Sequence, residues 1–447
     1  MDLMRVMPRG AAEIINKLES EGHCAYTVGG CVRDALMNAA PNDWDICTSA
    51  LPGQIINCFG ENSVIKTGVK HGTVTVRAED GLYEVTTFRV DGVYKDNRRP
   101  ESVEFVSDIR TDLSRRDFTV NAMAYNAREG LVDPFGGRED IKKGVIACVG
   151  SPERRFCEDA LRIMRALRFA SVLGFSIERG TADAIHDLKH LLENIAKERI
   201  RDELLKTCGG KNAYAVLEEY RDVITEIIPE LAPCVGFEQH NRYHRYDVYG
   251  HIIHAVANYS GGDDAVTAAL LLHDIEKPAC FVLGSDGVGH CSGHAEKSSE
   301  TAKAVYTRLR FPRALKESAA ELIKYHDAII EPNKNSVKKW MRMLGRKQFL
   351  RLIDMKRADM MAQADIDNAK RSAFLDRLRA IAEETTSSGE CYTLGQLALK
   401  GGDLYSSGVK ETDIGAALEK ALDAVVDEKV PNERTALLEY LRLTNVI

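Results

Sequence analysis

The sequence lacks the features that mark membrane-spanning, secreted or disulfide-stabilised proteins. No apolar run reaches the roughly 18 residues that a helix needs to span a bilayer. Residues 1–20 have the pattern of an amphipathic helix and no apolar signal-peptide core. The eleven cysteines form no C-x-x-C pair, which favours reduced thiols. We therefore expect a cytoplasmic protein with no membrane partner.

An excess of positive charge is also absent. The chain carries 60 Lys and Arg against 67 Asp and Glu, a formal net charge of −7. Any anionic partner must therefore be held by local patches rather than by the field of the whole protein. We find no internal repeat and no low-complexity tract. With 447 residues and 44% hydrophobic content, the chain can form about two to four domains with apolar cores.

The apolar patterns predict an α+β fold in which strands come early and helices follow. "CAYTV" (24–28) and "WDIC" (44–47) have the composition of strands. "GTVTVRAEDGLYEVTTFRV" (72–90) predicts a hairpin with Asp80-Gly81 near its turn. From about residue 150 the spacing is helical, as in "EDALRIMRALRFASVLG" (158–174), which ends on a glycine. We expect a mixed sheet with helices, followed by an all-α remainder.

Two aspartates, Asp43 and Asp45, are the first candidate site. At i and i+2 on a strand, both carboxylates project from one face. Converging carboxylates suit Mg²⁺, which takes its other ligands from water and substrate phosphates. Upstream, Gly30 opens a predicted helix whose N–H groups can approach a phosphate, and Arg33 can add a charged contact. Alone, a D-x-D pattern is more often a solvated strand face.

Five sequence motifs, in the order found in a known family, indicate a function for the two aspartates. The G-G-x-V-R-D segment with its D-x-D strand resembles the first motif of the class II tRNA nucleotidyltransferases (CCA-adding enzymes) and bacterial poly(A) polymerases. This family is a branch of the DNA polymerase beta-type nucleotidyltransferases. Similar family motifs follow at "RRDFTVNAMAYN" (115–126), "DPFGGREDIKKG" (133–144), "EDALRIMRALRF" (158–169) and "ERIRDELLK" (198–206). The resemblance implies that Asp43 and Asp45 are catalytic Mg²⁺ ligands and that Arg116 contacts the triphosphate or sugar.

The fourth motif suggests how a protein can select a base without a template. Asp159 and Arg162 are three residues apart on the predicted helix, hence on one face, and Arg165 and Arg168 extend that row. A carboxylate accepts from the exocyclic amine of cytosine or adenine, and a guanidinium donates to the adjacent ring nitrogen. Uracil and guanine present a carbonyl and a ring N–H at these positions, so neither contact can form. We therefore expect CTP and ATP as substrates.

The family includes several activities, and one segment bears on the choice. "RVDGVYKDNRRPESVEF" (89–105) resembles the flexible loop that CC-adding relatives lack or shorten. The C-terminal region is mixed in charge, whereas poly(A) polymerases of this family usually have a more basic one. We predict that the chain adds CCA to tRNA 3′ ends from CTP and ATP. Addition of A alone, or poly(A) synthesis, is the alternative. For Glu84, a third catalytic carboxylate and a core-rim residue both stay open.

Histidines gather in residues 240–330. With an adjacent His-Asp pair they resemble an HD-type metal-dependent phosphohydrolase domain. The resemblance implies a second metal site, for a divalent transition metal, with the ligands His251, His273, Asp274 and Asp359. His294 and His326 belong to the same segment. Glu276 replaces the usual glycine, and its extra carboxylate is expected to crowd the rim of the site, which argues against hydrolysis. A rival hypothesis is a metal phosphohydrolase with an RNA-binding head.

The resemblance and the composition together predict four domains. These are a nucleotidyltransferase head (1–145), a helical neck with the base-recognition motif (146–235), an HD-type helical domain (236–365) and a C-terminal helical tRNA-binding region (366–447). "KKWMRMLGRKQFLRLIDMKR" (338–357) contains eight Lys and Arg against one Asp. This stripe is a candidate contact for the phosphates of tRNA, although such a run is often a solvated helix face.

Overall fold

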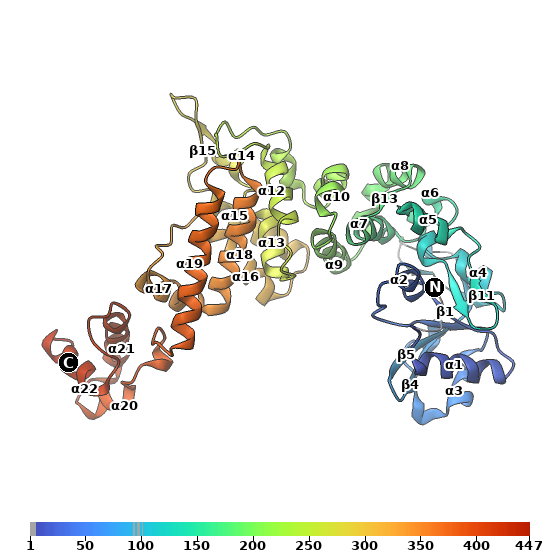
Figure 1. The fold of residues 1–447 in the computed structure, drawn as a ribbon, viewed down its shortest axis with the longest axis horizontal. Coiled ribbons are helices and arrows are strands. Elements are labelled where there is room, and N and C mark those ends of the chain that lie inside the picture. The colour runs from blue at the N-terminus through green and yellow to red at the C-terminus, as the bar shows by residue number, and fades with distance from the viewer. Residues whose placement is uncertain (1–5, 93, 96–98, 101) are drawn as a thin grey trace. The chain divides into compact units, whose positions relative to one another are not determined.

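The computed structural model describes residues 6–92, 94–95, 99–100 and 102–447. It divides into two compact units, Met1–Pro229 and Glu230–Ile447. Figure 1 traces their elements along the chain, and each unit is described below by itself. Within the described residues, no helix has both the length and the apolar character needed to cross a membrane.

A seven-stranded mixed sheet forms the first part of unit 1. Its order is β11-β10-β1-β2-β5-β4-β3, with β2 and β5 parallel and every other neighbouring pair antiparallel. The strands are β1 (Ala25–Val28), β2 (Ile46–Thr48), β3 (Val64–Ile65), β4 (Thr73–Ala78), β5 (Gly81–Thr87), β10 (Ala124–Asn126) and β11 (Gly130–Val132). The predicted hairpin is confirmed as β4–β5, which pair from Thr73 opposite Thr86 to Ala78 opposite Gly81.

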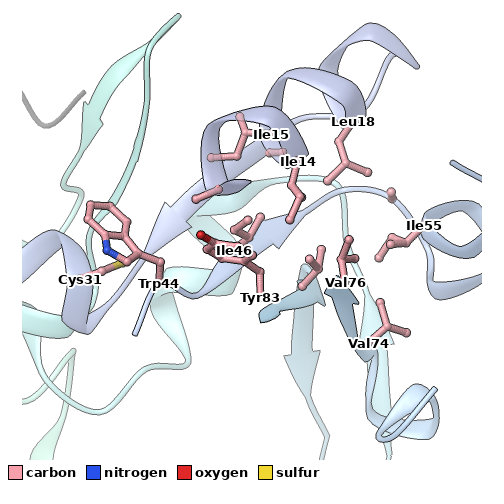
Figure 2. Packing of buried hydrophobic residues seen from close by; sticks show 14 of the residues in the cluster. Ile14, Ile15, Leu18, Cys31, Trp44, Ile46, Ile55, Val74, Val76 and Tyr83 are labelled. Atoms are coloured by element: carbon pink, nitrogen blue, oxygen red, sulfur yellow. The ribbon is translucent and has the colours of Figure 1, made fainter. Parts of the chain in front are cut away.

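Apolar residues cover both faces of this sheet. On one face, helix α1 (Arg9–Ser20) packs Ile14, Ile15 and Leu18 against side chains such as Ile46 and Val76, as Figure 2 shows. This spacing of i, i+1 and i+4 forms one helical stripe, so the predicted N-terminal amphipathic helix is confirmed. α2 (Gly30–Leu36) and α3 (Pro52–Phe59) belong to the same core. The opposite face is covered by α4 (Ile109–Ser114).

The segment predicted to be a loop between the first two motifs contains paired strands. β6 (Arg89–Asp91) pairs with β9 (Val103–Phe105), and β7 (Tyr94–Lys95) pairs with β8 (Arg99–Pro100). Its residues 93, 96–98 and 101 lie outside the described part of the chain. The backbone N–H of Arg89 donates to the buried carboxylate of Asp112 at 3.2 Å, which ties the base of this segment to α4.

Helices make up the rest of unit 1. α5 (Gly137–Lys143) is followed by β12 (Val145–Ile146), which pairs in parallel with β13 (Ser176–Ile177). Helix α7 (Leu161–Leu173) is followed by Gly174, which adopts the left-handed conformation that favours glycine. The later helices are α6 (Pro152–Glu158), α7 (Leu161–Leu173), α8 (Arg179–Leu188), α9 (Lys197–Cys208), α10 (Ala213–Glu219) and α11 (Arg221–Ile227). α9 supports α7, because Ser171 Oγ donates to the Thr207 carbonyl at 2.6 Å.

Unit 2 is almost entirely helical, which with the mixed sheet of unit 1 confirms the α+β prediction. Its strands are the short pair β14 (Val282–Leu283) and β15 (Gly289–His290). Figure 1 shows its longer helices packed side by side. The helices are α12 (Val248–Ala257), α13 (Asp264–Leu272), α14 (Lys277–Cys280), α15 (His294–Arg308), α16 (Arg313–Tyr325), α17 (Lys334–Leu344), α18 (Arg346–Ala362), α19 (Asn368–Ser387), α20 (Gly401–Ser406), α21 (Glu411–Val426) and α22 (Arg434–Leu443).

Candidate active site

The paired aspartates lie directly before β2, where the sheet presents them to solvent. Asp43 and Asp45 are exposed, whereas Trp44 between them is buried in the core beside Cys31 (Figure 2). This alternation is what the i, i+2 spacing predicts for an extended segment. The carbonyl of Asp45 accepts from Val28 N at 3.0 Å, which anchors the segment to β1. Both carboxylates therefore project from the same side.

Glu84 stands next to the pair. In the parallel β2–β5 pairing, Ile46 lies opposite Val85, so the preceding residues Asp45 and Glu84 are neighbours. All three carboxylates line one concavity of about 790 Å³. Although Asp45 is exposed as a residue, the walls of the concavity partly desolvate its carboxyl; this desolvation, together with Glu84 and Asp43, raises the pKa of Asp45 above its ordinary value, and Arg116 opposes them. Mutual repulsion of this kind is relieved by a cation, so the geometry fits a divalent metal.

The glycine pair Gly29-Gly30 allows the backbone to lie close to the Arg116 side chain. Gly29 has φ 82° and ψ −128°, a conformation that L side chains rarely adopt, and a Cβ there would lie 3.1 Å from Nη1 of Arg116. Gly30 begins α2. Arg33 is buried, and it donates to Asn121 Oδ1 at 2.6 Å and to Asp34 Oδ1 at 2.8 Å. Its guanidinium therefore fixes α2 to the 115–126 motif.

A second pocket, of about 240 Å³, lies in the same unit and collects most of the predicted nucleotide-binding residues. Arg116 lines this pocket and also acts electrostatically on Asp45, so it connects the carboxylates to the pocket. Nε of Arg116 is buried and makes no hydrogen bond. The pocket is lined by Arg115, Arg116, Asp117, Asp159, Arg162, Arg165 and Arg199. Of these, Arg115, Asp117 and Arg199 were not among the site residues predicted from the sequence.

The predicted helical row from Asp159 to Arg168 is wrong in its geometry. α6 ends at Glu158, Asp159 is extended (φ −140°, ψ 102°), and α7 begins only at Leu161. The Asp159 carboxylate accepts from Leu161 N at 3.0 Å, because the first N–H groups of a helix lack helical partners. Asp159 and Arg162 nevertheless line the same pocket. The turn between α6 and α7 therefore brings together the two side chains that a continuous helix was expected to align.

Both residues of the pair have partners within the protein. Arg199 Nη2 lies 3.2 Å from Asp159 Oδ2. Arg162 Nη1 donates to Glu158 Oε2 at 2.7 Å and to the carbonyl of Arg155 at 3.0 Å. A base that binds here must therefore share or displace these contacts.

The two later arginines of the predicted row, Arg165 and Arg168, have different partners. Arg165 bonds to Asp117 Oδ2 through Nε at 2.8 Å and Nη2 at 2.6 Å. Arg168 instead points to α9, where Nε lies 2.5 Å from Glu203 Oε2, and it does not line the pocket. Both guanidinium groups contact the ring of Phe169, at 5.3 and 4.0 Å from its centroid. Arg168 therefore joins α7 to α9.

Asp117 is expected to stabilise the junction between the sheet and α7. Burial opposes its ionisation, but Arg165 outweighs burial and lowers the pKa of Asp117 from 3.8 to about 2. Asp117→Asn should cost about 2 kcal/mol at pH 7. Because the pKa of Asp117 is lower in the folded state than in the unfolded state, its ionised carboxylate stabilises the fold at pH values above the unfolded-state pKa. This contribution is complete above about pH 4 and disappears toward pH 2. Thermal unfolding of both proteins across this range tests it; a difference independent of pH would contradict it.

Unit 2 brings together the predicted HD-type residues. His251 Nε2 lies 2.8 Å from Asp359 Oδ1 and 3.2 Å from Asp274 Oδ2. His273 Nε2 lies 3.3 and 3.4 Å from the same two carboxylates. The two carboxylates outweigh burial and raise the pKa of His273 to about 10. The ligand atoms of His251, His273 and Asp359 lie within 4.8 Å of one another, a geometry that suits one divalent ion.

Glu276 does not crowd this cluster, contrary to the expectation from the sequence. Its carboxylate accepts a hydrogen bond from Thr301 Oγ1 at 2.6 Å, and Glu276 is not among the residues that line the pocket of the cluster. Helix α15 thus holds the Glu276 side chain away from the predicted metal ligands.

The basic stripe at 338–357 is largely neutralised by acids that are distant in sequence. Lys338 lies 2.5 Å from Glu390, Lys339 lies 2.8 Å from Asp427, and Arg342 pairs with Asp423 and Glu419 of α21. Arg351 and Arg357 pair with Asp263 and Asp376. The cations of this stripe therefore mainly form ion pairs within unit 2, and few of them are available to bind a phosphate backbone.

We expect Lys339→Gln with Arg342→Gln to leave the salt dependence of tRNA binding unchanged. Each lost phosphate contact would reduce the slope of log Kobs against log[salt] by roughly 0.7–0.9. The double variant should instead lower the Tm by a few degrees, since it removes the α17–α21 ion pairs. Binding titrations at several salt concentrations measure the slope. A slope reduced by more than one unit would show that these residues do contact RNA.

Comparisons with known proteins agree with this geometry. Residues 25–147 match the family model described as "Poly A polymerase head domain", and residues 174–234 match "Probable RNA and SrmB- binding site of polymerase A". Fold and site thus define a nucleotidyltransferase with an RNA-binding helical segment. A CCA-adding enzyme of Lactobacillus delbrueckii subsp. bulgaricus is 32% identical over 97% of both chains. The chain therefore belongs to the CCA-adding enzyme family, and the predicted family is confirmed.

Other relatives extend the comparison. The CCA-adding enzyme of Geobacillus kaustophilus is 50% identical over 45% of this chain and 49% of its own. The crystal structure of the Bacillus stearothermophilus CCA-adding enzyme in complex with CTP superposes with a TM-score of 0.74, at 29% identity, over 98% of both chains. The Thermotoga maritima enzyme complexed with tRNA_CCA has the same fold, with a TM-score of 0.60 and 20% identity over 99% of this chain and 97% of that one.

Proposed function

We propose that this chain completes tRNA 3′ ends by transferring CMP twice and AMP once, from CTP and ATP, with release of pyrophosphate. The observation that carries the proposal is the position of Arg116. This residue lines the pocket that contains Asp159 and Arg162, and its charge acts on Asp45 of the carboxylate group. A nucleotide with its base between Asp159 and Arg162 then has its phosphates directed toward the carboxylates.

Asp43 and Asp45 are the proposed ligands of Mg²⁺, with Glu84 as a third carboxylate. Three acids around one concavity form a hard oxygen donor set. Bound Mg²⁺ would supply positive charge for the attack of the tRNA 3′ hydroxyl on the α-phosphate. Arg116 and the N–H of Gly30 hold the triphosphate and sugar. Arg33 contributes positive charge at the start of α2, where Asn121 fixes its guanidinium.

Asp159 and Arg162 select the base. Ionised Asp159 accepts from the exocyclic amine of cytosine or adenine, and Arg162 donates to the adjacent ring nitrogen. Uracil and guanine would leave a carboxylate facing a carbonyl and a guanidinium facing an N–H, which a recessed site penalises strongly. Arg165 and Arg168 position α7 through Asp117 and Glu203. One pocket thus suffices for both nucleotides.

Addition of A alone and poly(A) synthesis are the alternatives within the family. CTP use is supported by the relative that was crystallised with CTP and by the curated CCA-adding relatives. The paired strands at 89–105 stand where CC-adding relatives lack or shorten a loop. Full CCA addition is therefore the function that we propose.

For unit 2 we propose a divalent transition metal held by His251, His273, Asp274 and Asp359. Nε2 of each histidine lies within 3.4 Å of both carboxylates. Mixed imidazole and carboxylate donors suit such ions. This position belongs to a different compact unit from the proposed catalytic carboxylates.

Two variants distinguish the proposal from the rival phosphohydrolase with an RNA-binding head. Asp43→Asn with Asp45→Asn should abolish incorporation of radiolabelled CMP into tRNA that lacks CCA, whereas His273→Ala should retain it. If the aspartate variant retains incorporation and His273→Ala loses it, the assignment of the active site to the head is wrong. Circular dichroism and gel filtration of each variant control for folding.

A further inference from the structure

The aromatic ring of Phe169 is contacted by three arginines that come from two separate parts of unit 1. Arg165 and Arg168 are its neighbours on α7, whereas Arg33 reaches it from α2. The guanidinium carbons lie 5.2 Å (Arg33), 5.3 Å (Arg165) and 4.0 Å (Arg168) from the ring centroid. Each of these distances is within the range of a cation–π contact. One ring therefore joins the helix that begins at the glycine pair to the helix of the second pocket.

Each of the three cations also has its own carboxylate partner. The pairs are Arg33–Asp34 (2.7 Å), Arg165–Asp117 (2.6 Å) and Arg168–Glu203 (2.5 Å). Burial and the nearby charge of Arg165 lower the pKa of the Arg168 guanidinium, against the attraction of Glu203. The electron-rich face of an aromatic ring stabilises such partly desolvated cations, which an aliphatic side chain does not. The ring thus contributes electrostatically as well as by packing.

A hydrogen-bonded path runs between two of the same arginines. Arg33 Nη1 donates to Asn121 Oδ1 at 2.6 Å, and Asn121 Nδ2 donates to Asp117 Oδ1 at 3.3 Å. Asp117 Oδ2 in turn accepts from Arg165 Nη2 at 2.6 Å. Asn121 and Asp117 are buried, so water competes little for these bonds. Arg33 and Arg165 are therefore connected by two routes, one through the ring and one through the amide.

The ring itself is held in place. Phe169 is 6% exposed, and Phe118 meets it edge to face, with ring centroids 5.8 Å apart and an interplanar angle of 79°. Phe118 belongs to the 115–126 motif, and its N–H donates to Asp117 Oδ1 at 2.8 Å. Phe169 lines neither the carboxylate concavity nor the second pocket. It can therefore influence a bound nucleotide only through the residues that it positions.

We propose that Phe169 is a positioning residue for nucleotidyl transfer, which fixes the triphosphate end of the nucleotide site relative to the base pocket through Arg33 and Arg165. The inference rests on the proposed function, in which α2 holds the triphosphate and the pocket at Asp159 selects the base. Arg165 lines that pocket. A displacement of about 1 Å can cost roughly 100-fold in rate. Weakening the ring should therefore impair nucleotide affinity and base choice together.

Fluorination of the ring tests the proposal. Mono-, di- and trifluorophenylalanine in place of Phe169 of the full-length chain keep the ring shape but withdraw electrons from its face, which weakens cation–π attraction stepwise. The Kd of CTP, measured without tRNA, should rise with each fluorine and reach about 5- to 30-fold for the trifluoro ring, the factor that corresponds to a desolvated cation–π contact. The preference for CTP over UTP should fall in the same order, while the Tm changes little.

Phe88 is the matched control. Its ring is fully buried in the same unit and lies near the ring of Tyr26, with centroids 6.2 Å apart, in the core of the sheet. Within the described part of the chain, no lysine or arginine lies over this ring. The same fluorinated residues in place of Phe88 should leave the Kd of CTP and the preference over UTP unchanged.

The outcomes separate this inference from the proposed function. A Kd of CTP that does not change with fluorine number, whether or not the Tm falls, assigns Phe169 to packing alone and overturns the inference. Equal effects at Phe88 and Phe169 overturn it as well, and so does a loss of CTP affinity with an unchanged preference over UTP. If the wild-type chain binds CTP but adds no CMP to tRNA that lacks CCA, the proposed function fails, and the binding series still tests the role of the ring.

Discussion

Replacement of Asp45 with asparagine is expected to lower kcat for CMP transfer by about 10³-fold or more. The carboxylate is a proposed ligand of the metal whose charge would stabilise the transition state by several kcal/mol, and each 1.36 kcal/mol corresponds to tenfold in rate. Glu84 and Asp43 remain in this variant, but the residue next to both of them loses its charge. Single-turnover extension of tRNA that lacks CCA measures the chemical step.

The matched control is Glu79→Gln, which removes an exposed carboxylate from the β4–β5 turn of the same sheet. It should leave kcat within about twofold, since it removes no proposed ligand. An Asp45→Asn enzyme with near-normal kcat and weakened nucleotide binding would contradict the catalytic role. Such a result would assign Asp45 to substrate binding alone.

The second large effect concerns the choice of base. Asp159→Asn is expected to lower the preference for CTP over UTP, as a ratio of kcat/KM, by about 10- to 100-fold, the equivalent of a hydrogen bond to a charged group. The asparagine amide can donate to the O4 carbonyl of uracil, which a carboxylate cannot. Steady-state kinetics with each nucleotide on tRNA that lacks CCA measures the ratio.

Asp183→Asn is the control, because it removes an exposed carboxylate from α8 in the same unit. Arg199→Lys is informative as well, since Arg199 lies 3.2 Å from Asp159. If Arg199 only positions Asp159, this variant should affect discrimination less than Asp159→Asn does. Unchanged discrimination in Asp159→Asn would assign base selection to another residue.

Short-range sequence patterns predicted those parts of the site that are local in the chain. The aspartates and the β4–β5 hairpin follow from alternation and turn residues. The α+β class follows from the change of period near residue 150. The break at Asp159 was not predictable in this way, because "EDALR" contains neither glycine nor proline. It depends on Asp159 itself, which bonds to Leu161 N, and on Arg199 forty residues later.

Long-range pairing accounts for the features that the sequence did not reveal. The stripe at 338–357 looks free in the sequence because its acidic partners, such as Glu390 and Asp427, lie some 50–90 residues away. The same holds for Asp117, whose partner Arg165 lies 48 residues further on. The histidines and aspartates that cluster in unit 2 come together only when α12, α13, α15, α16 and α18 pack. Charge alone therefore misidentifies surfaces when tertiary partners are unknown.

Sequencing of tRNA 3′ ends measures CCA addition itself. A tRNA transcript that ends at the nucleotide before CCA is incubated with Mg²⁺ and CTP alone, ATP alone, or both, and its 3′ ends are then sequenced. We expect addition of CC with CTP alone and of CCA with both. Failure of CTP to extend this transcript, or long A tails with ATP, would contradict it.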